Sequence, residues 1–171
     1  AELVALLAPE DARGVRFAYR FENLTDQIVA VVHKVHPELR STEDASFAVA
    51  DERLVYNGTF VVNIAKSGLF SVNLIIPEGF DIDTLSAAEV SHWDELTVDN
   101  KRVITVHFTR KVLGQVSLQI ALSRPISELP RQLNVPRIEC VDALKHTGRV
   151  VISVDRGVRL TVANRSGVSE L

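Results

Sequence analysis

The chain has 171 residues, of which 46% are hydrophobic and 24% charged, and its formal net charge is -3 at pH 7. These values are typical of a folded globular protein with a sizeable core, and they exclude a disordered chain. The weak negative charge offers no basic footprint for nucleic acid, so we expect no nucleic-acid partner. No stretch approaches the ~18 consecutive apolar residues of a membrane span, so we expect no span in this segment.

The single cysteine, Cys140, excludes an internal disulfide. Its apolar setting, with Ile138 and Val141 nearby, predicts a buried thiol rather than a reactive one. The chain contains no methionine and begins at Ala1. We therefore expect a piece of a longer protein.

Short runs of alternating apolar and polar residues fill most of the chain, as in β-strands. Between them, residues 37–44 are polar and predict a loop or a single helical turn. The predicted strands are 3–8, 15–22, 27–36, 47–49, 52–56, 59–65, 70–76, 88–94, 102–109, 115–122, 137–140, 149–154 and 158–163.

Two loops that end in glycine predict hairpins. A three-residue loop at 66–68 would place Ile64 opposite Phe70, with every large apolar side chain on one face. Such a loop needs a left-handed residue at its last position, so Gly68 is expected to have a positive φ. The loop at 155–157 predicts a second hairpin between residues 150–154 and 158–162, with Gly157 in the same role.

Further turn signals extend this pattern into meanders. Asn57-Gly58 predicts a two-residue hairpin turn before residue 59. Asp99-Asn100 marks another turn, and residues 111–114 are expected to join strands 102–109 and 115–122. Many short strands at this spacing predict an all-β fold, an antiparallel β-sandwich built from meanders and hairpins.

Three prolines in residues 123–136 predict a crossover or a link between domains, because proline cannot donate to a central strand ladder. We expect a single sandwich domain over residues 1–171, with a sub-boundary possible at 123–136. The alternative is that residues 137–171 begin another module.

The order of these features resembles β-sandwich segments in very large, mostly uncharacterised envelope or exported proteins of bacteria such as planctomycetes. The resemblance covers roughly residues 15–163 and implies a structural or binding module, with an extracytoplasmic or envelope location and no catalytic residues. It rests on Ile76-Pro77-Glu78-Gly79-Phe80, Glu89-Val90-Ser91-His92-Trp93, residues 103–106, Gly114, residues 116–120, Leu129-Pro130 and residues 147–152.

Two constellations contain residue types that bind metals. His33 and His36 are three apart in a predicted strand, so their side chains would face opposite ways, and we expect them to bind no metal. Asp81 and Asp83 share a face near Glu78 and could hold calcium, but the regular Asp-x-Asp-x-Asp-Gly series is missing. We therefore expect a solvated acidic loop, and neither a metal nor a cofactor.

The densest mixed cluster is Glu89, His92, Trp93, Asp94 and Glu95. On one strand, Glu89 and Trp93 would share a face, with His92 and Asp94 on the other. One strand cannot make acid and base groups converge, and the sequence lacks a Gly-x-Ser-x-Gly elbow, a phosphate loop and a His-Glu-x-x-His motif. If the protein binds a small ligand, we expect the candidate residues to be Trp93, His92, Glu89, Asp81 and Asp83.

The sequence thus favours a non-catalytic structural or interaction module of a larger exported protein. Its expected partners are neighbouring domains of the same chain, and glycans or another protein. The main alternative is a carbohydrate-binding module that uses Trp93, with Tyr19 or Tyr56, as a stacking surface. It would require Trp93 to be exposed beside another aromatic ring. An enzyme would require acids such as Asp81, Asp83, Glu89 and Asp94 to converge in one pocket.

Overall fold

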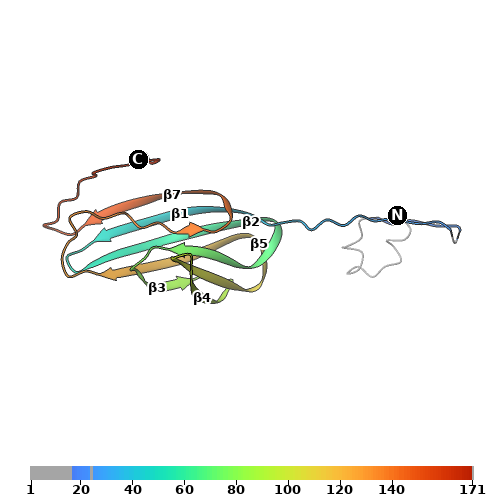
Figure 1. The fold of residues 1–171 in the computed structure, drawn as a ribbon, viewed down its shortest axis with the longest axis horizontal. Helices are drawn as coiled ribbons and strands as arrows, with labels where there is room; N and C mark the ends of the chain where they lie inside the picture. Colours follow the sequence, from blue (N-terminus) through green and yellow to red (C-terminus); the bar gives the residue numbers. More distant parts are fainter. Residues whose placement is uncertain (1–16, 24, 171) are drawn as a thin grey trace. The chain divides into compact units, whose positions relative to one another are not determined.

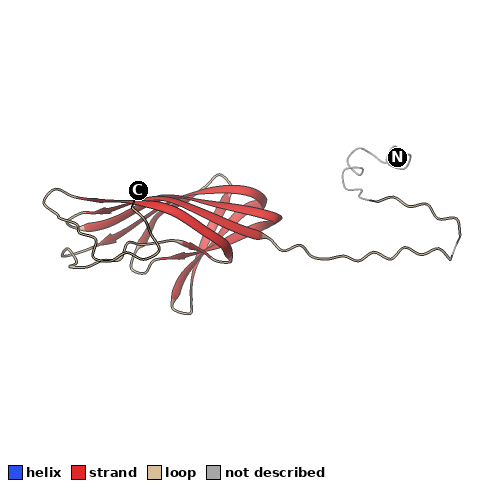
Figure 2. Ribbon diagram, turned by 90° about the horizontal axis from the view of Figure 1, so that it is seen from above, coloured by secondary structure: helices blue, strands red, loops and turns tan. Residues whose placement is uncertain are grey.

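The computed structural model describes residues 17–23 and 25–170, and in these residues it contains strands and loops but no helix (Figures 1 and 2). The fold is all-β, as the alternating sequence predicts. The strands are β1 (Glu38–Val49), β2 (Arg53–Ile76), β3 (Asp81–Ser86), β4 (Val90–Val98), β5 (Lys101–Pro125), β6 (Glu139–Cys140) and β7 (Ala143–Val154).

The sandwich is one sheet folded into two layers by its two longest strands, β2 and β5. One layer has the order β3-β5-β2-β1-β7 and uses residues 53–64 of β2 with residues 114–125 of β5. In the other layer, residues 69–76 of β2 pair with β6 and with the beginning of β5, which also pairs with β4. All strand pairs are antiparallel except β1 with β7, which is parallel.

The bend between the layers lies where the sequence predicts two hairpins. Both β2 and β5 pass through it as continuous strands whose mutual register shifts between Ile64 and Ser71. Lys66, not Gly68, has a positive φ, of 66°, and Gly114 in the facing strand has a φ of 105°. Ile64 is buried as predicted, whereas Phe70 is 63% exposed. The hairpin prediction for 59–65 and 70–76 is therefore wrong, because pairing of β2 with β5 along both halves replaces pairing of β2 with itself.

Other local turn signals are also overridden by pairing between distant strands. Asn57 and Gly58 lie inside β2, opposite Ser46 and Ala45 of β1, so no turn forms there. The sequence predicts a loop or a single helical turn at residues 37–44, yet nearly all of them belong to β1. Residues 111–114, predicted to turn, lie inside β5. The turn at Asp99-Asn100 is confirmed, and both residues have positive φ values of 49° and 61°.

The prediction for the second glycine-ended loop is confirmed in one part and wrong in the other. Gly157 has a positive φ of 92°, as predicted, and Val158 N–H donates to the carbonyl of Asp155 at 3.1 Å. Residues 158–162 form no strand, so the predicted hairpin with 150–154 is wrong. The described residues in 15–22 and 27–36 also form no strand, and residues 3–8 lie outside the described part.

The crossover at 123–136 does not separate two modules. β6 pairs with β2 and β7 pairs with β1, so residues 139–154 complete this sandwich. The chain divides into two compact units, Ala1–Lys34 and Val35–Leu171, and the sandwich belongs to the second. One domain over all of residues 1–171 stays a prediction.

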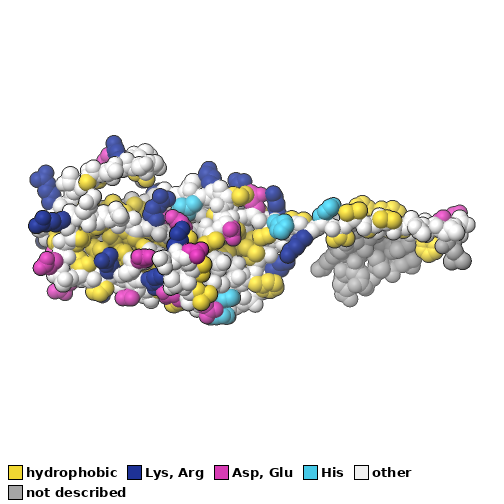
Figure 3. Space-filling model, in the orientation of Figure 1, with side chains coloured by type: hydrophobic (Ala, Val, Ile, Leu, Met, Phe, Trp, Pro, Cys, Tyr) yellow, Lys and Arg dark blue, Asp and Glu magenta, His cyan; other side chains and the backbone are white. Residues whose placement is uncertain are grey.

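The core of the described residues is a single cluster drawn from both layers. Its side chains alternate inward chiefly along β1, β2 and β5. Cys140 is part of this cluster and is 8% exposed, which confirms the predicted burial. On the face drawn in Figure 3, basic and acidic side chains are interspersed over the sandwich with apolar ones between them. The largest fully buried side chains are Tyr56, Phe47, Phe60, Ile64, Leu74, Ile76, Ile104, Leu118, Leu122 and Ile138.

Candidate functional site

The candidate site lies on the layer that contains β4. The Asp99-Asn100 turn joins β4 to β5 and sets their register, so that Leu96 faces Val103. This register shifts between Val90 and His92, which leaves Ser91 as an extra residue, a β-bulge. After the bulge, His92 faces His107.

Alternation then decides which side chains point outward. Ile104, Val106 and Phe108 of β5 are buried in the core, so Val103 and His107 lie on the outer face of the layer. Their register partners lie on the same face, which places His92 and Leu96 of β4 there as well.

An aliphatic row crosses this outer face. Leu96 faces Val103, and Val103 faces Ile75 of β2 on its other side. Leu96 is 59% exposed, and Val98 at the end of β4 is 50% exposed. A sheet face turned to water is normally polar. We call Leu96, Val98, Val103 and Ile75 the aliphatic row.

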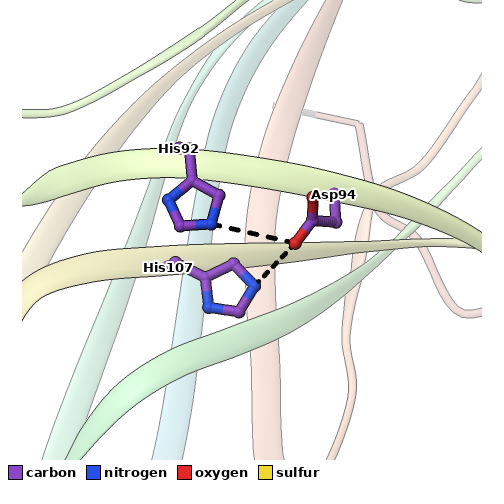
Figure 4. Close-up of side chains that lie close together, drawn as sticks. All are labelled: His92, Asp94 and His107. Carbon is purple, nitrogen blue, oxygen red and sulfur yellow. Dashed lines mark ion pairs between the residues drawn. The ribbon is translucent and has the colours of Figure 1, made fainter.

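A cluster of two histidines and an aspartate lies on the same outer face (Figure 4). The Nε2 atom of His107 is 3.0 Å from the Oδ2 atom of Asp94, and that of His92 is 3.9 Å from the same oxygen. The two imidazole rings stack with centroids 4.5 Å apart and an interplanar angle of 9°. His92 and Asp94 share a face because they are two residues apart on β4, and β5 supplies His107.

The inward side of β4 carries different chemistry. Trp93 faces the buried Val106, so its indole is on the opposite side of the sheet from the aliphatic row. Glu95 accepts hydrogen bonds from Arg102 at 2.6 and 3.0 Å. This contact lowers the pKa of the Glu95 carboxyl and raises the pKa of the Arg102 guanidinium, and the pair ties β4 to β5.

The structure does not bring the other predicted site residues to this face. Asp81 pairs with Ser123 in the other layer, where the Ser123 hydroxyl donates to Asp83 at 3.0 Å. Glu89 precedes β4, and its carbonyl accepts from the N–H of Thr109 at 2.9 Å. Asp81 and Asp83 therefore do not converge with Asp94, whereas an acid–base enzyme would need these carboxylates in one pocket.

A pocket of about 690 Å³ lies at the end of the sandwich beside the crossover. Glu78 and Phe80 line it with Arg124 and Arg137, and the proline-containing residues 125–136 form much of its wall. None of Trp93, His92, Glu89, Asp81 and Asp83 lines this pocket, so the candidate ligand residues and the pocket are separate.

A buried polar network inside the sandwich was not predicted. Ser41 and Glu43 of β1 point into the core, where the Tyr56 hydroxyl donates to the Glu43 carboxylate. His146 of β7 bridges the two, with Nδ1 2.8 Å from the Ser41 Oγ and Nε2 3.2 Å from the Glu43 Oε2. Ser41 is only 3% exposed, so its hydroxyl cannot reach a substrate. The network joins β1, β2 and β7 inside the core.

The sequence did not predict the contribution of His107 or the buried network, because it does not show which strands lie beside β5 and β1. His107 alternates with the buried residues of β5, which indicates its outward direction but not the strand beside it. Residues 37–44 read as a loop, although Ser41 and Glu43 alternate in phase with Phe47. His33 and His36 are both exposed and lie in no strand; that they bind no metal stays a prediction.

No protein-family model matches the chain, and no curated protein matches it. Among solved structures, the chain is similar to a two-domain zinc metallopeptidase at 14% identity and a TM-score of 0.39, over 52% of this chain and 20% of that one. The chain thus spans about a fifth of the length of that peptidase.

Two smaller proteins are similar over nearly their whole length. One is a type I cohesin in a cohesin–dockerin complex from Clostridium thermocellum, with 9% identity, a TM-score of 0.44, and coverage of 73% of this chain and 99% of that one. The other is the chitin-binding domain of a chitinase from Pyrococcus furiosus, with 12% identity, a TM-score of 0.33, and coverage of 64% and 98%. At these identities and scores the similarities carry no argument about function.

Within residues 17–23 and 25–170, no helix is long and apolar enough to span a membrane.

Proposed function

We propose that the chain is a non-catalytic interaction module that binds another protein through the outer face of its β4-β5-β2 layer. The observation that supports this is the aliphatic row, because Leu96 and Val98 are exposed next to Val103 and Ile75. Contiguous apolar side chains on a sheet face are typical of protein-binding surfaces.

The chemistry of the row favours a protein over a sugar. Its members are aliphatic, and sugars are usually held by stacking on aromatic rings. Trp93 points to the other side of β4, and no aromatic ring in the described residues stacks on it. The carbohydrate-binding alternative therefore lacks the paired aromatic platform that it requires.

The position of β4 supports the same proposal. Within the described part of the chain, β4 pairs with β5 alone, and none of its nine residues is buried. An edge strand with free backbone groups can accept further hydrogen bonds from a partner chain. The partner that suits this face is a protein segment with apolar side chains, and a neighbouring domain of a longer exported or envelope protein would supply one.

A partner captured from cells that produce the protein, then purified, provides the test. Its affinity for wild type is compared with that for Leu96→Asp and for Val151→Asp. Val151 is a matched control because it is 61% exposed on β7, in the other layer. We expect Leu96→Asp to weaken binding at least ~10-fold, since it places a charge against an apolar contact, and Val151→Asp to leave it unchanged.

Equal affinity for wild type and Leu96→Asp would contradict the proposal. A glycan that shifts the fluorescence of Trp93 saturably, and whose binding measured by calorimetry is lost in Trp93→Ala, would establish the carbohydrate-binding alternative instead.

A further inference from the structure

Three side chains that can bind a metal converge on the outer face of β4 and β5. One nitrogen or oxygen atom from each of His92, Asp94 and His107 lies within 4.8 Å of the others. The two contacts to the Asp94 oxygen, 3.0 and 3.9 Å, bracket the separation of ligand atoms around a tetrahedral ion. With metal–ligand bonds of about 2.05 Å, that separation is about 3.3 Å.

We propose that His92, Asp94 and His107 form a binding site for one divalent transition-metal ion. Two imidazoles and one carboxylate favour zinc and its first-row neighbours, whereas calcium and magnesium prefer oxygen ligands alone. The three side chains occupy one side of the ion, and water completes the coordination.

The bulge residue Ser91 provides an independent argument. Its Oγ atom is 3.0 Å from the Nδ1 atom of His92. When Nδ1–H donates to this hydroxyl, Nε2 of His92 is left unprotonated and turned toward Asp94. A hydrogen bond from the second ring nitrogen is the usual way in which proteins orient a histidine ligand.

No lysine or arginine among the described residues forms an ion pair with the carboxylate of Asp94. Among the described residues, the ion pairs of Asp94 are with His92 and His107 alone. The nearby guanidinium of Arg102 pairs with Glu95 on the other side of the sheet. Asp94 and His92 are well exposed and His107 is partly exposed, so an ion enters from solvent without opening the core.

The bound ion would join the two strands. His92 and Asp94 belong to β4 and His107 to β5, and β4 has no other strand partner in the described part of the chain. An ion that binds the folded hairpin and not the unfolded chain raises stability by mass action. Metal binding should therefore be visible as a rise in the unfolding temperature.

The test uses metal-free protein without an affinity tag, titrated calorimetrically with Zn²⁺ and followed by visible absorption with Co²⁺. The variants are Asp94→Asn, His107→Ala and Ser91→Ala. The matched control is His36→Ala, which removes an exposed histidine outside the cluster. Magnesium serves as the control ion.

We expect one Zn²⁺ per chain, with binding weakened at least ~10-fold in Asp94→Asn and His107→Ala and about 10-fold in Ser91→Ala. Zn²⁺ should raise the unfolding temperature of wild type and His36→Ala, but not of Asp94→Asn. Unchanged Zn²⁺ affinity in Asp94→Asn and His107→Ala, or an equal loss in His36→Ala, would overturn the assignment. Magnesium binding as tight as zinc binding would overturn the choice of metal. All variants are at exposed or partly exposed positions, and circular dichroism shows whether each one is folded.

Discussion

The phenol of Tyr56 lies over Gly58, where a β-carbon would come within 2.8 Å of the hydroxyl oxygen. The two residues are on the same face of β2, and the hydroxyl continues across the core to the Glu43 carboxylate. A glycine that signals a hairpin turn in the sequence thus provides space for an aromatic ring inside a strand.

Replacing this glycine should disturb the buried network. In Gly58→Ala the new methyl group also approaches Ala45, at 3.2 Å from its β-carbon, so the ring of Tyr56 must move. We expect a loss of about 1–3 kcal/mol of unfolding free energy, as for other overpacked core sites. Urea denaturation measures it, with Asn57→Ala as the exposed neighbouring control. Equal stability of Gly58→Ala and the control would show that the ring relaxes freely.

Removing the Tyr56 hydroxyl should destabilise the fold at neutral pH. Tyr56→Phe keeps the ring but leaves the Glu43 carboxylate without one of its buried donors. An unsatisfied buried acceptor costs about 1–3 kcal/mol. Urea denaturation of wild type and variant measures the difference, and a variant as stable as wild type would mean that water replaces the lost donor.

The same pair predicts a dependence on alkaline pH. Burial, followed by the hydrogen bond and the charge of Glu43, raises the pKa of Tyr56 in the folded protein. Tyrosine in an unfolded chain ionises at about pH 10. The stabilisation that comes from the protonated Tyr56 hydroxyl is therefore complete below that pH and is lost as pH rises above it. The stability of wild type should therefore fall toward that of Tyr56→Phe above about pH 10. Parallel pH profiles for the two proteins would contradict this.

The thiol of Cys140 should react slowly in the native protein. Burial, with a smaller effect from the charge of Asp142, raises its pKa to about 11, and thiolate is the reactive form. At about pH 8 we expect labelling to be at least ~100-fold slower than in the urea-unfolded chain. Cys140 is the only cysteine, so the label reports this site alone. Comparable rates in native and unfolded protein would show that the β6 region opens readily.

The bend of β5 should depend on the backbone of Gly114. Its φ is 105°, and an added β-carbon would have no atom within 4 Å, so Gly114→Ala introduces backbone strain and no steric contact. We expect a loss of about 1–2 kcal/mol, measured against Gln115→Ala. A neutral Gly114→Ala would indicate that the bend adjusts to a negative φ.

Local alternation in the sequence determined which side chains of a strand share a face. The pairs Val62 with Ile64 and Ile104 with Val106 are all buried, as their spacing predicts. A strand has a period of two wherever it pairs, so these faces do not depend on its partner. The all-β class and the burial of Cys140 followed from the same information.

Only the tertiary structure decided which strands pair, and the pairing in turn determined which side chains meet at the candidate site. Lys66 to Gly68 and residues 111–114 read locally as turns, but long-range pairing of β2 with β5 made them the bend of two continuous strands. His107 is 15 residues after His92, and the register of one hairpin with a bulge at Ser91 brings the two rings together. Which strands pair depends on how completely their apolar faces are buried against each other. That burial is a property of the whole sheet and cannot be determined from a short segment of sequence.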